Sequence, residues 1–185
     1  MDISKNELRK QYRKKRNLLS ETQRHTESER VCGKLLDSEQ YRNADVVFCY
    51  VSYGSEFETS SLIEAAFLDN KIVAVPKMIG NEMIFCRVYP DSEYQPNCFG
   101  IMEPVDAVEV HPQDFISVLM VLPGLCFDEQ NGRIGYGGGF YDRYIAKYKL
   151  NAKFSIVALA LSCQYYSGNI PMEVHDVRPD LVIFP

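Results

Sequence analysis

Short, unbroken apolar runs separated by helix-like segments constrain the fold of this chain more than any other feature. The clearest runs cover residues 46–51, 72–75 and 118–122. A strand with one wet face alternates apolar and polar residues, whereas a strand buried on both faces is continuously apolar. The runs therefore predict an α/β fold in which a mostly parallel sheet is covered by helices on both faces.

Helical periodicity and capping residues predict most of the other elements. Leu8, Tyr12 and Leu19 fall near helical spacing, which predicts a helix close to the start of the chain. Ser20 and Gln23 form a capping-box pattern that begins a second helix. The further elements expected along the chain are helices at 59–69 and 141–149 and strands at 83–88, 154–161 and 181–184.

Prolines mark two expected interruptions of this pattern. Pro76 is expected to end the strand at 72–75, because proline cannot donate a hydrogen bond to a neighbouring strand. Residues 89–114 contain four prolines and show little periodicity. We interpret them as an irregular excursion from one domain that spans residues 1–185, not as a linker between two domains.

Composition is that of an ordinary globular protein. The chain has 185 residues, of which 46% are hydrophobic and 24% charged, and this length fits a single domain with a substantial core. No apolar stretch approaches the ~20 residues that a membrane helix needs. The opening Met-Asp-Ile-Ser-Lys has no apolar core of the kind found in secretory signals. We therefore expect a cytoplasmic protein with no membrane partner.

The cysteines point to a reducing compartment. The chain has six of them, at positions 32, 49, 86, 98, 126 and 163, and no two form a C-x-x-C pair. Several lie inside apolar runs, where a free thiol behaves as a small hydrophobic group. This pattern predicts neither a disulfide framework nor a structural zinc site.

Charge is unevenly distributed along the chain. The formal net charge is -5, yet residues 5–16 contain seven basic side chains and a single acid, Glu7. Such a cationic segment on an acidic protein predicts a defined anionic partner, although a solvated helix face would have the same composition. A nucleic-acid-binding module built on this segment is an alternative, but the acidic total argues against nucleic acid as a partner.

The most informative segment is a glycine-rich loop that follows the apolar run at 118–122 and leads into a helix. It contains Arg133 and four glycines, at positions 135, 137, 138 and 139. Without side chains, backbone N–H groups can approach a ligand, and a helix N-terminus adds further free donors. These features predict a phosphate cradle. Neither the Walker A motif nor G-x-G-x-x-G is present, and the alternative is a glycine-rich surface loop without a ligand.

Two carboxylates lie where they could hold a cation beside that cradle. Asp142 follows the loop directly, and Asp176 precedes the last strand. A carboxylate next to bound phosphate repels it unless a cation lies between them, and Mg²⁺ favours one or two carboxylates together with substrate phosphates. Asp142 alone could equally be an acid in the first turn of a helix, where the helix dipole favours it.

These residues carry a family resemblance. The segments that carry it are residues 5–9, 55–59, 99–104, 122–128 and 132–142 and the closing pair at 175–176. In this order they resemble the 5-formyltetrahydrofolate cyclo-ligases, also called methenyltetrahydrofolate synthetases, over nearly the whole chain. The resemblance implies a Rossmann-like α/β domain that uses ATP and Mg²⁺ to convert 5-formyltetrahydrofolate to 5,10-methenyltetrahydrofolate, releasing ADP and phosphate.

The resemblance also implies roles for individual residues. Lys5, Arg9 and Arg133 would be catalytic, contacting the phosphates of ATP. The other positions implied for ATP are Ile134, Gly135, Tyr136, Gly137, Gly138, Gly139, Phe140 and Tyr141. Those implied for the folate are Val51, Glu56, Tyr136, Gly137, Gly138, Gly139 and Phe140. Asp142 and Asp176 match magnesium positions.

Three points remain open at this stage. Phe140 stands where the family often has tyrosine, so a hydrogen bond from a hydroxyl is lost there. Glu56 could instead be an acid at the N-terminus of the helix expected at 59–69. A nucleotide-binding regulator that has lost activity is an alternative to the enzyme. We expect the protein to be a monomer.

Overall fold

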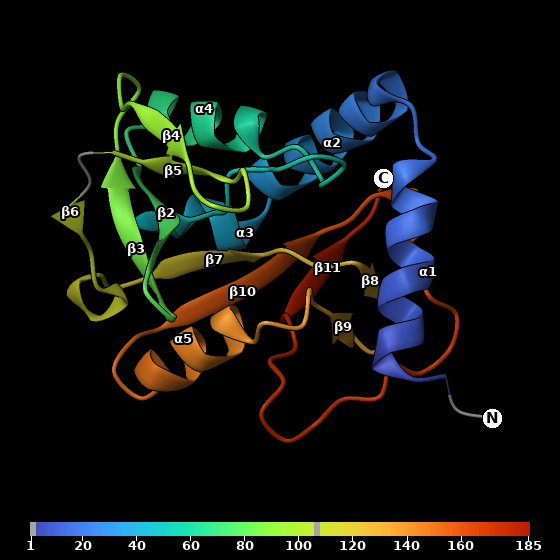
Figure 1. Cartoon of the computed structure of the whole chain (residues 1–185). Helices are drawn as coiled ribbons and strands as arrows, with labels where there is room; N and C mark the ends of the chain where they lie inside the picture. Colours follow the sequence, from blue (N-terminus) through green and yellow to red (C-terminus); the bar gives the residue numbers. More distant parts are fainter. Residues whose placement is uncertain (1–2, 106–107) are drawn as a thin grey trace.

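A seven-stranded, mostly parallel sheet forms the centre of the computed structural model, which describes residues 3–105 and 108–185 (Figure 1). Its strands, in chain order, are β1 (Val46–Phe48), β2 (Ile72–Ile79), β3 (Glu82–Val88), β6 (Val108–Glu109), β7 (Val118–Leu122), β10 (Phe154–Leu159) and β11 (Leu181–Ile183). They lie in the order β11-β10-β7-β1-β2-β3-β6. Neighbours from β11 to β2 are parallel, and β3 and β6 complete one side in the antiparallel sense.

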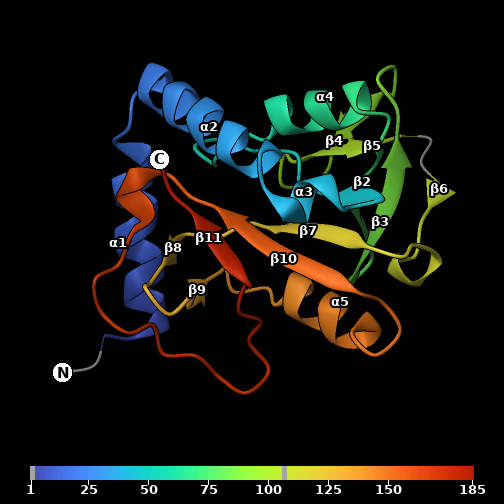
Figure 2. The same ribbon diagram turned by 180° about the vertical axis from the view of Figure 1, so that it is seen from behind.

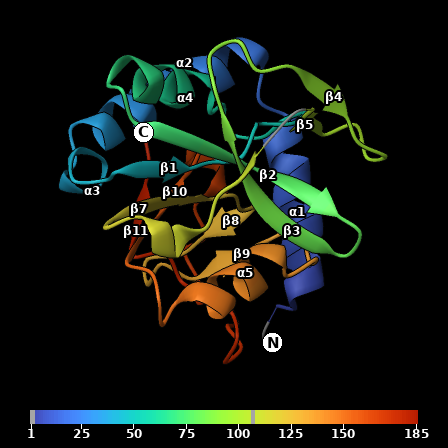
Figure 3. The same ribbon diagram turned by 90° about the vertical axis from the view of Figure 1, so that its left-hand side faces the viewer.

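Both faces of the sheet are covered, as the continuous apolar runs predicted. Helices α2 (Glu21–Leu36), α3 (Glu39–Arg42) and α4 (Ser60–Leu68) cover one face, and α5 (Phe140–Tyr148) covers the other (Figure 3). Alternate strand residues point to opposite faces, so Val47 packs with the α2–α4 layer while Phe48 packs with α5. Burial on both sides explains why these strands contain almost no polar residues.

Helix α1 (Lys5–Asn17) belongs to neither layer. It begins at a capping box formed by Ser4 and Glu7. Its buried residues Leu8 and Tyr12 pack on a small hairpin of β8 (Cys126–Phe127) and β9 (Arg133–Ile134), which the sequence did not predict. Figure 2 shows α1 standing at the end of the sheet beside this hairpin. Most of the helix surface is therefore left free for its basic residues.

Two expectations about the middle of the chain were wrong in part. Strand β2 does not stop at Pro76 but runs on to Ile79 and pairs with β3 as a hairpin. Its pairing with β1 ends at Ala74, so Pro76 lies where β2 has a neighbour on one side only, and such an edge tolerates proline. The segment 89–114 is not wholly irregular, because it holds β4 (Tyr94–Pro96), β5 (Met102–Pro104), β6 and a 3-10 turn, η1 (Pro112–Asp114).

The strand order creates a switch point between β1 and β7. These two strands are parallel neighbours, but the chain leaves β1 toward β2 on one side and reaches β10 from β7 on the other. Their carboxyl ends lead into diverging loops, which opens a crevice at that edge of the sheet. Open α/β sheets bind ligands at such a crevice.

The cysteines lie mostly in the interior of the protein. All six are free, and Cys32, Cys49, Cys86 and Cys126 are buried. Within residues 3–105 and 108–185, no cluster of three or more His, Cys, Asp or Glu side chains could enclose a metal ion. In the same part of the chain, none of the helices has the length and hydropathy needed to cross a membrane.

Tyr144 on α5 provides a test of the packing under the sheet. Its side chain is 5% exposed, and its hydroxyl has no hydrogen-bond partner among the described residues. An unpaired buried hydroxyl costs roughly 1–3 kcal/mol. We expect Tyr144→Phe to leave the free energy of unfolding unchanged or to raise it, as measured by urea denaturation.

Tyr148, one turn further along α5, is the matched control. Its hydroxyl lies 3.3 Å from Nδ1 of His111, so Tyr148→Phe removes a hydrogen bond and should lower stability by about 0.5–1.5 kcal/mol. Equal losses in the two variants would contradict the assignment of an unpaired hydroxyl to Tyr144.

Candidate functional site

A cleft of about 1910 Å³ opens at the switch point. It is lined by α1, the loop after β1, the β2–β3 and β4–β5 hairpins, the glycine loop with the start of α5, and residues 171–177. Pockets for one small ligand usually measure about 300–1,000 Å³, so this cleft has room for two. Every site residue expected from the sequence lines it, from Lys5 and Val51 to Asp176.

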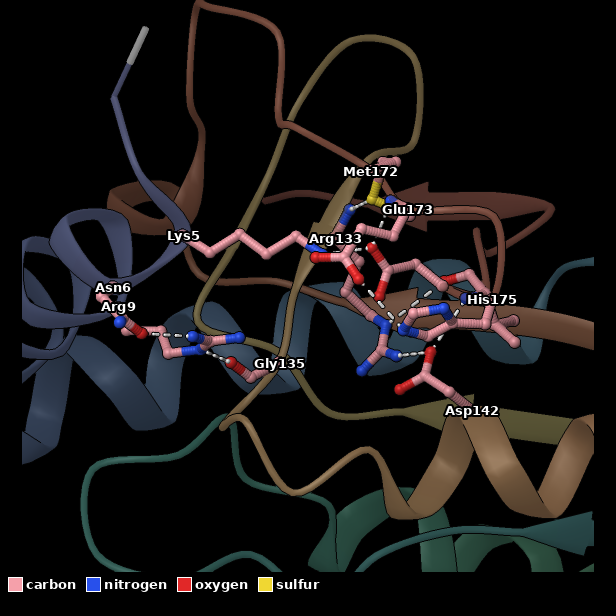
Figure 4. Close-up of polar contacts among 11 residues, drawn as sticks. Lys5, Asn6, Arg9, Arg133, Gly135, Asp142, Met172, Glu173 and His175 are labelled. Atoms are coloured by element: carbon pink, nitrogen blue, oxygen red, sulfur yellow. Dashed lines mark hydrogen bonds and ion pairs between the residues drawn. The ribbon is translucent and has the colours of Figure 1, made fainter.

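The start of α1 forms a cationic wall of the cleft (Figure 4). Lys5 Nζ lies 2.5 Å from Asp176 Oδ2 and 2.9 Å from Glu173 Oε1. These two acids raise the pKa of Lys5 against the opposing effect of burial, so the ammonium stays charged at neutral pH. Arg9 Nε donates to the Gly135 carbonyl at 3.1 Å, which ties α1 to the glycine loop.

The glycine loop has the backbone that its composition predicted. Gly137 has a φ of 101°, a conformation that disfavours other residues, and it lies beneath the Arg9 guanidinium. Gly139 is the N-cap of α5 with a φ of 64° and makes no side-chain cap. The first N–H groups of α5 are therefore not capped by a side chain and face a cleft with basic walls.

Phe140, the residue that departs from the family pattern, begins α5. Its ring lies under the Arg143 guanidinium, 4.9 Å from the ring centroid. Arg143 Nη1 also donates to the Gly138 carbonyl at 2.7 Å. The ring therefore holds an arginine against the end of the loop, a contact that needs no hydroxyl.

Arg133 and Asp142 form a nearly buried ion pair at the base of the cleft. Arg133 Nη2 lies 2.7 Å from Asp142 Oδ1, and the two side chains are 6% and 16% exposed. Arg133 also donates from Nη1 to the Pro123 carbonyl and from Nε to the Val177 carbonyl. Asp142 is in the first turn of α5, as the helix-dipole interpretation expected, and is also an ion-pair partner.

Asp142 and Asp176 come together from distant parts of the sequence. The same Oδ1 of Asp142 accepts from the backbone N–H of Val177, the residue that follows Asp176. Burial raises the pKa of Asp176, but hydrogen bonds from the Glu173 backbone and Lys5 outweigh it, so the pKa lies below its usual value. Two carboxylates that line the same cleft suit Mg²⁺ held partly by substrate oxygens, and they do not form an all-protein cage.

The loop after β1 forms the opposite end of the cleft. Glu56 Oε2 accepts from the backbone N–H of Tyr53 at 2.9 Å. Helix α4 begins at Ser60 and has no acid in its first turn, so the alternative role of Glu56 as a helix N-terminal acid is wrong. Val51, Glu56 and Tyr136 all line the cleft here.

Several residues in the site were not singled out by sequence reasoning. Glu173 and the Val177 backbone lie in an irregular loop that carries no motif. Arg16 is a buried residue that lines the cleft, and its spacing in the sequence could have identified it. Lys5, Arg9 and Arg16 are spaced by four and seven residues, which places them on one face of a helix.

Comparison with known proteins gives one family. Residues 2–185 match the 5-formyltetrahydrofolate cyclo-ligase family. The chain is 33% identical to the 5-formyltetrahydrofolate cyclo-ligase of Haemophilus influenzae over 92% of both chains. It is 30% identical to that of Escherichia coli K12 over 94% of this chain and 96% of the other.

A solved structure gives the same answer for the fold. The NMR structure of Aquifex aeolicus 5,10-methenyltetrahydrofolate synthetase matches with a TM-score of 0.80 and 31% identity, covering 98% of this chain and 89% of that one. The chain is therefore an enzyme that belongs to the 5-formyltetrahydrofolate cyclo-ligase family.

Proposed function

We propose that this enzyme converts 5-formyltetrahydrofolate to 5,10-methenyltetrahydrofolate with MgATP, releasing ADP and phosphate. The observation that carries the proposal is the meeting of three cations, Lys5, Arg9 and Arg133, with the uncapped start of α5 in one cleft. This arrangement suits a polyphosphate. A volume of about 1910 Å³ leaves space for a folate beside the nucleotide.

The reaction has a chemical obstacle that ATP removes. The formyl carbon is a poor electrophile, because the nitrogen lone pair stabilises its carbonyl, and the oxygen is a poor leaving group. Transfer of the γ-phosphoryl group to the formyl oxygen breaks its bond to ADP and gives an imino-phosphate. The 10-nitrogen then attacks the formyl carbon and loses its proton, and the C–O bond breaks to release phosphate. Both reacting atoms belong to one molecule, so ring closure mainly requires orientation.

The residues around the glycine loop stabilise the moving charge. Three donations from Arg133 go to Asp142, Pro123 and Val177, which fixes its guanidinium and leaves two of its five N–H groups for phosphate oxygens. Lys5 and Arg9 add positive charge from α1. Because these groups are already oriented, little reorganisation is needed as charge develops.

Asp142 and Asp176 are the residues that would hold Mg²⁺ in this proposal. The ion would neutralise charge on the phosphate oxygens that it shares with these carboxylates. Lys5 and Arg133 now neutralise the same two acids. A cation that binds here would therefore compete with these two ion pairs.

The folate would occupy the end of the cleft formed by the loop after β1. Glu56 can accept hydrogen bonds from the N–H groups at the edge of the pterin. Val51 would add apolar surface, and Tyr136 and Phe140, which line the same cleft, would lie between this end and the phosphate end. This order along the cleft would bring the formyl oxygen to the γ-phosphate.

A direct assay tests the proposed function. The purified protein, given MgATP and 5-formyltetrahydrofolate, should form the methenyl product, which is followed by its absorbance. ATP binding without turnover of an active folate stock would instead identify a nucleotide-binding protein that has lost this activity.

Loss of Arg133 should greatly slow the reaction. Arg133→Ala removes a charge-assisted donor to the transferred group and leaves Asp142 without its partner, so we expect kcat/KM to fall about 10²-fold or more. Arg178→Ala removes an exposed guanidinium that donates to the Gln130 carbonyl outside the cleft, and it should retain near-normal activity. Near-normal kinetics for Arg133→Ala would remove Arg133 from the site.

Loss of either proposed magnesium ligand should shift the metal requirement. Asp142→Asn or Asp176→Asn weakens the attraction for Mg²⁺, so a Mg²⁺ titration of activity at fixed ATP should reach its midpoint at a higher concentration. Asp114→Asn removes a carboxylate outside the cleft and should leave the midpoint in place. An unchanged titration in both site variants would refute their assignment.

A further inference from the structure

Arg16 is a buried cation on the wall of the cleft. The residue lies in the last turn of α1 and is 5% exposed. Nε donates to Ser55 Oγ at 3.1 Å, and Nη1 donates to the Tyr136 hydroxyl at 2.5 Å. No carboxylate lies within ion-pair distance of it among residues 3–105 and 108–185, whereas Lys5 has two such partners, Glu173 and Asp176, and Arg133 has one, Asp142.

Such an arrangement is costly for the protein alone. Removing a guanidinium from water without a counter-charge is unfavourable, and hydroxyl oxygens compensate only in part. An apolar residue at this position would avoid the cost. Arg16 lines the same cleft as the other site residues, so an electron-rich group of a ligand can supply what the protein lacks.

The position of Arg16 in the cleft indicates that its ligand is the folate and not the nucleotide. Arg16 lies eleven residues after Lys5 on a continuous helix, about 16 Å along its axis. It is therefore far from the end where Lys5 pairs with Asp176. Its partner Ser55 directly precedes Glu56, in the loop that forms the folate end of the cleft.

Tyr136 links Arg16 with Glu56. Burial raises the pKa of Tyr136, as does the nearby Glu56 carboxylate, while Arg16 opposes the rise. A carboxylate and a guanidinium thus flank one phenol at this end of the cleft. The pterin edge has a matching order, with two N–H donors followed by the 4-carbonyl oxygen.

We propose that Arg16 is a folate-positioning residue whose guanidinium donates to the pterin 4-carbonyl oxygen while Glu56 accepts from the neighbouring N–H groups. This inference rests on the proposed function. The 4-carbonyl lies peri to N5, the nitrogen that carries the formyl group, so holding this carbonyl orients the part of the ring from which the formyl group projects. Arg16 acts on the orientation of the substrate and not on the phosphoryl group.

The test compares Arg16→Met with Lys14→Met. Both variants remove one positive charge from α1, but Lys14 is exposed and lies outside the cleft. For each protein we would measure the thermal midpoint without ligands and, by calorimetry, the separate Kd values for 5-formyltetrahydrofolate and for MgATP. A third ligand, 5-formyltetrahydropteroate, has the same pterin and formyl group but no glutamate carboxylates.

We expect Arg16→Met to keep or raise the thermal midpoint, because an uncompensated buried charge is replaced by an apolar side chain. The Kd for 5-formyltetrahydrofolate should rise about 10- to 100-fold, because the variant loses one hydrogen bond from a charged donor to the ligand. The Kd for the pteroate analogue should rise equally, and the Kd for MgATP should stay within about twofold. Lys14→Met should match the original protein throughout, and Arg16→Lys should recover part of the folate affinity.

Other outcomes would overturn the proposal. A lower thermal midpoint or failure of Arg16→Met to fold, with Arg16→Lys also destabilised, would make Arg16 a structural brace between α1 and the loop after β1. A penalty with the folate that disappears with the pteroate analogue would assign Arg16 to a glutamate carboxylate. Weaker MgATP binding would assign it to the nucleotide. If the original protein does not bind or convert 5-formyltetrahydrofolate, the proposed function itself fails, whatever Arg16 does.

Discussion

The parallel pairing of β1 with β7 is the constraint on which the rest of the structure depends. These central strands are joined residue by residue from Val46 and Val118 onward. Because the chain diverges on either side of the pair, the loop with Glu56 and the glycine loop leave the same edge of the sheet without blocking each other. Neither strand could carry polar residues at these positions, since both faces are covered. The scaffold is thus apolar, and the chemistry lies in its loops and in α1.

Docking of α1 completes the cleft by a different physical route. The helix contributes little to the main core and is held by Leu8 and Tyr12 on the β8–β9 hairpin. That same hairpin leads into the glycine loop. One apolar contact therefore fixes the position of α1 and its basic side chains relative to the backbone of that loop. A longer apolar stripe on α1 would hold it more firmly but would leave fewer positions for basic residues. The bond from Arg9 to the Gly135 carbonyl shows how closely the two segments are joined.

The sequence predicts the central strands and the helices well, because each is determined by local pattern. The capping box at Ser20 and the buried run at 118–122 are examples of this. It fails where pairing depends on distant neighbours: Pro76 is compatible with β2 only because β1 has ended, and the two-residue strands β8 and β9 have no pattern to detect. For the site, glycines and acids can be found from spacing and family resemblance. Their partners cannot, since Glu173 and Val177 reach the cleft by tertiary folding alone.

The charge pattern of the cleft distinguishes two kinds of cation. Lys5 and Arg133 are paired with the acids that would bind Mg²⁺, so a cation entering with ATP would have to compete with these ion pairs. Within the part of the chain that the structure describes, the hydrogen bonds of the Arg16 guanidinium go to two hydroxyl groups, so an acidic side chain does not compete with a ligand there. If the proposed function holds, ATP binding would exchange one set of charges for another, whereas folate binding would supply a polar partner for the buried Arg16 guanidinium. The free energy of binding would then differ between the two ends, although α1 supplies cations to both. At the end near Arg16, the protein would accept a lower stability in exchange for a cation that is already oriented toward the ligand.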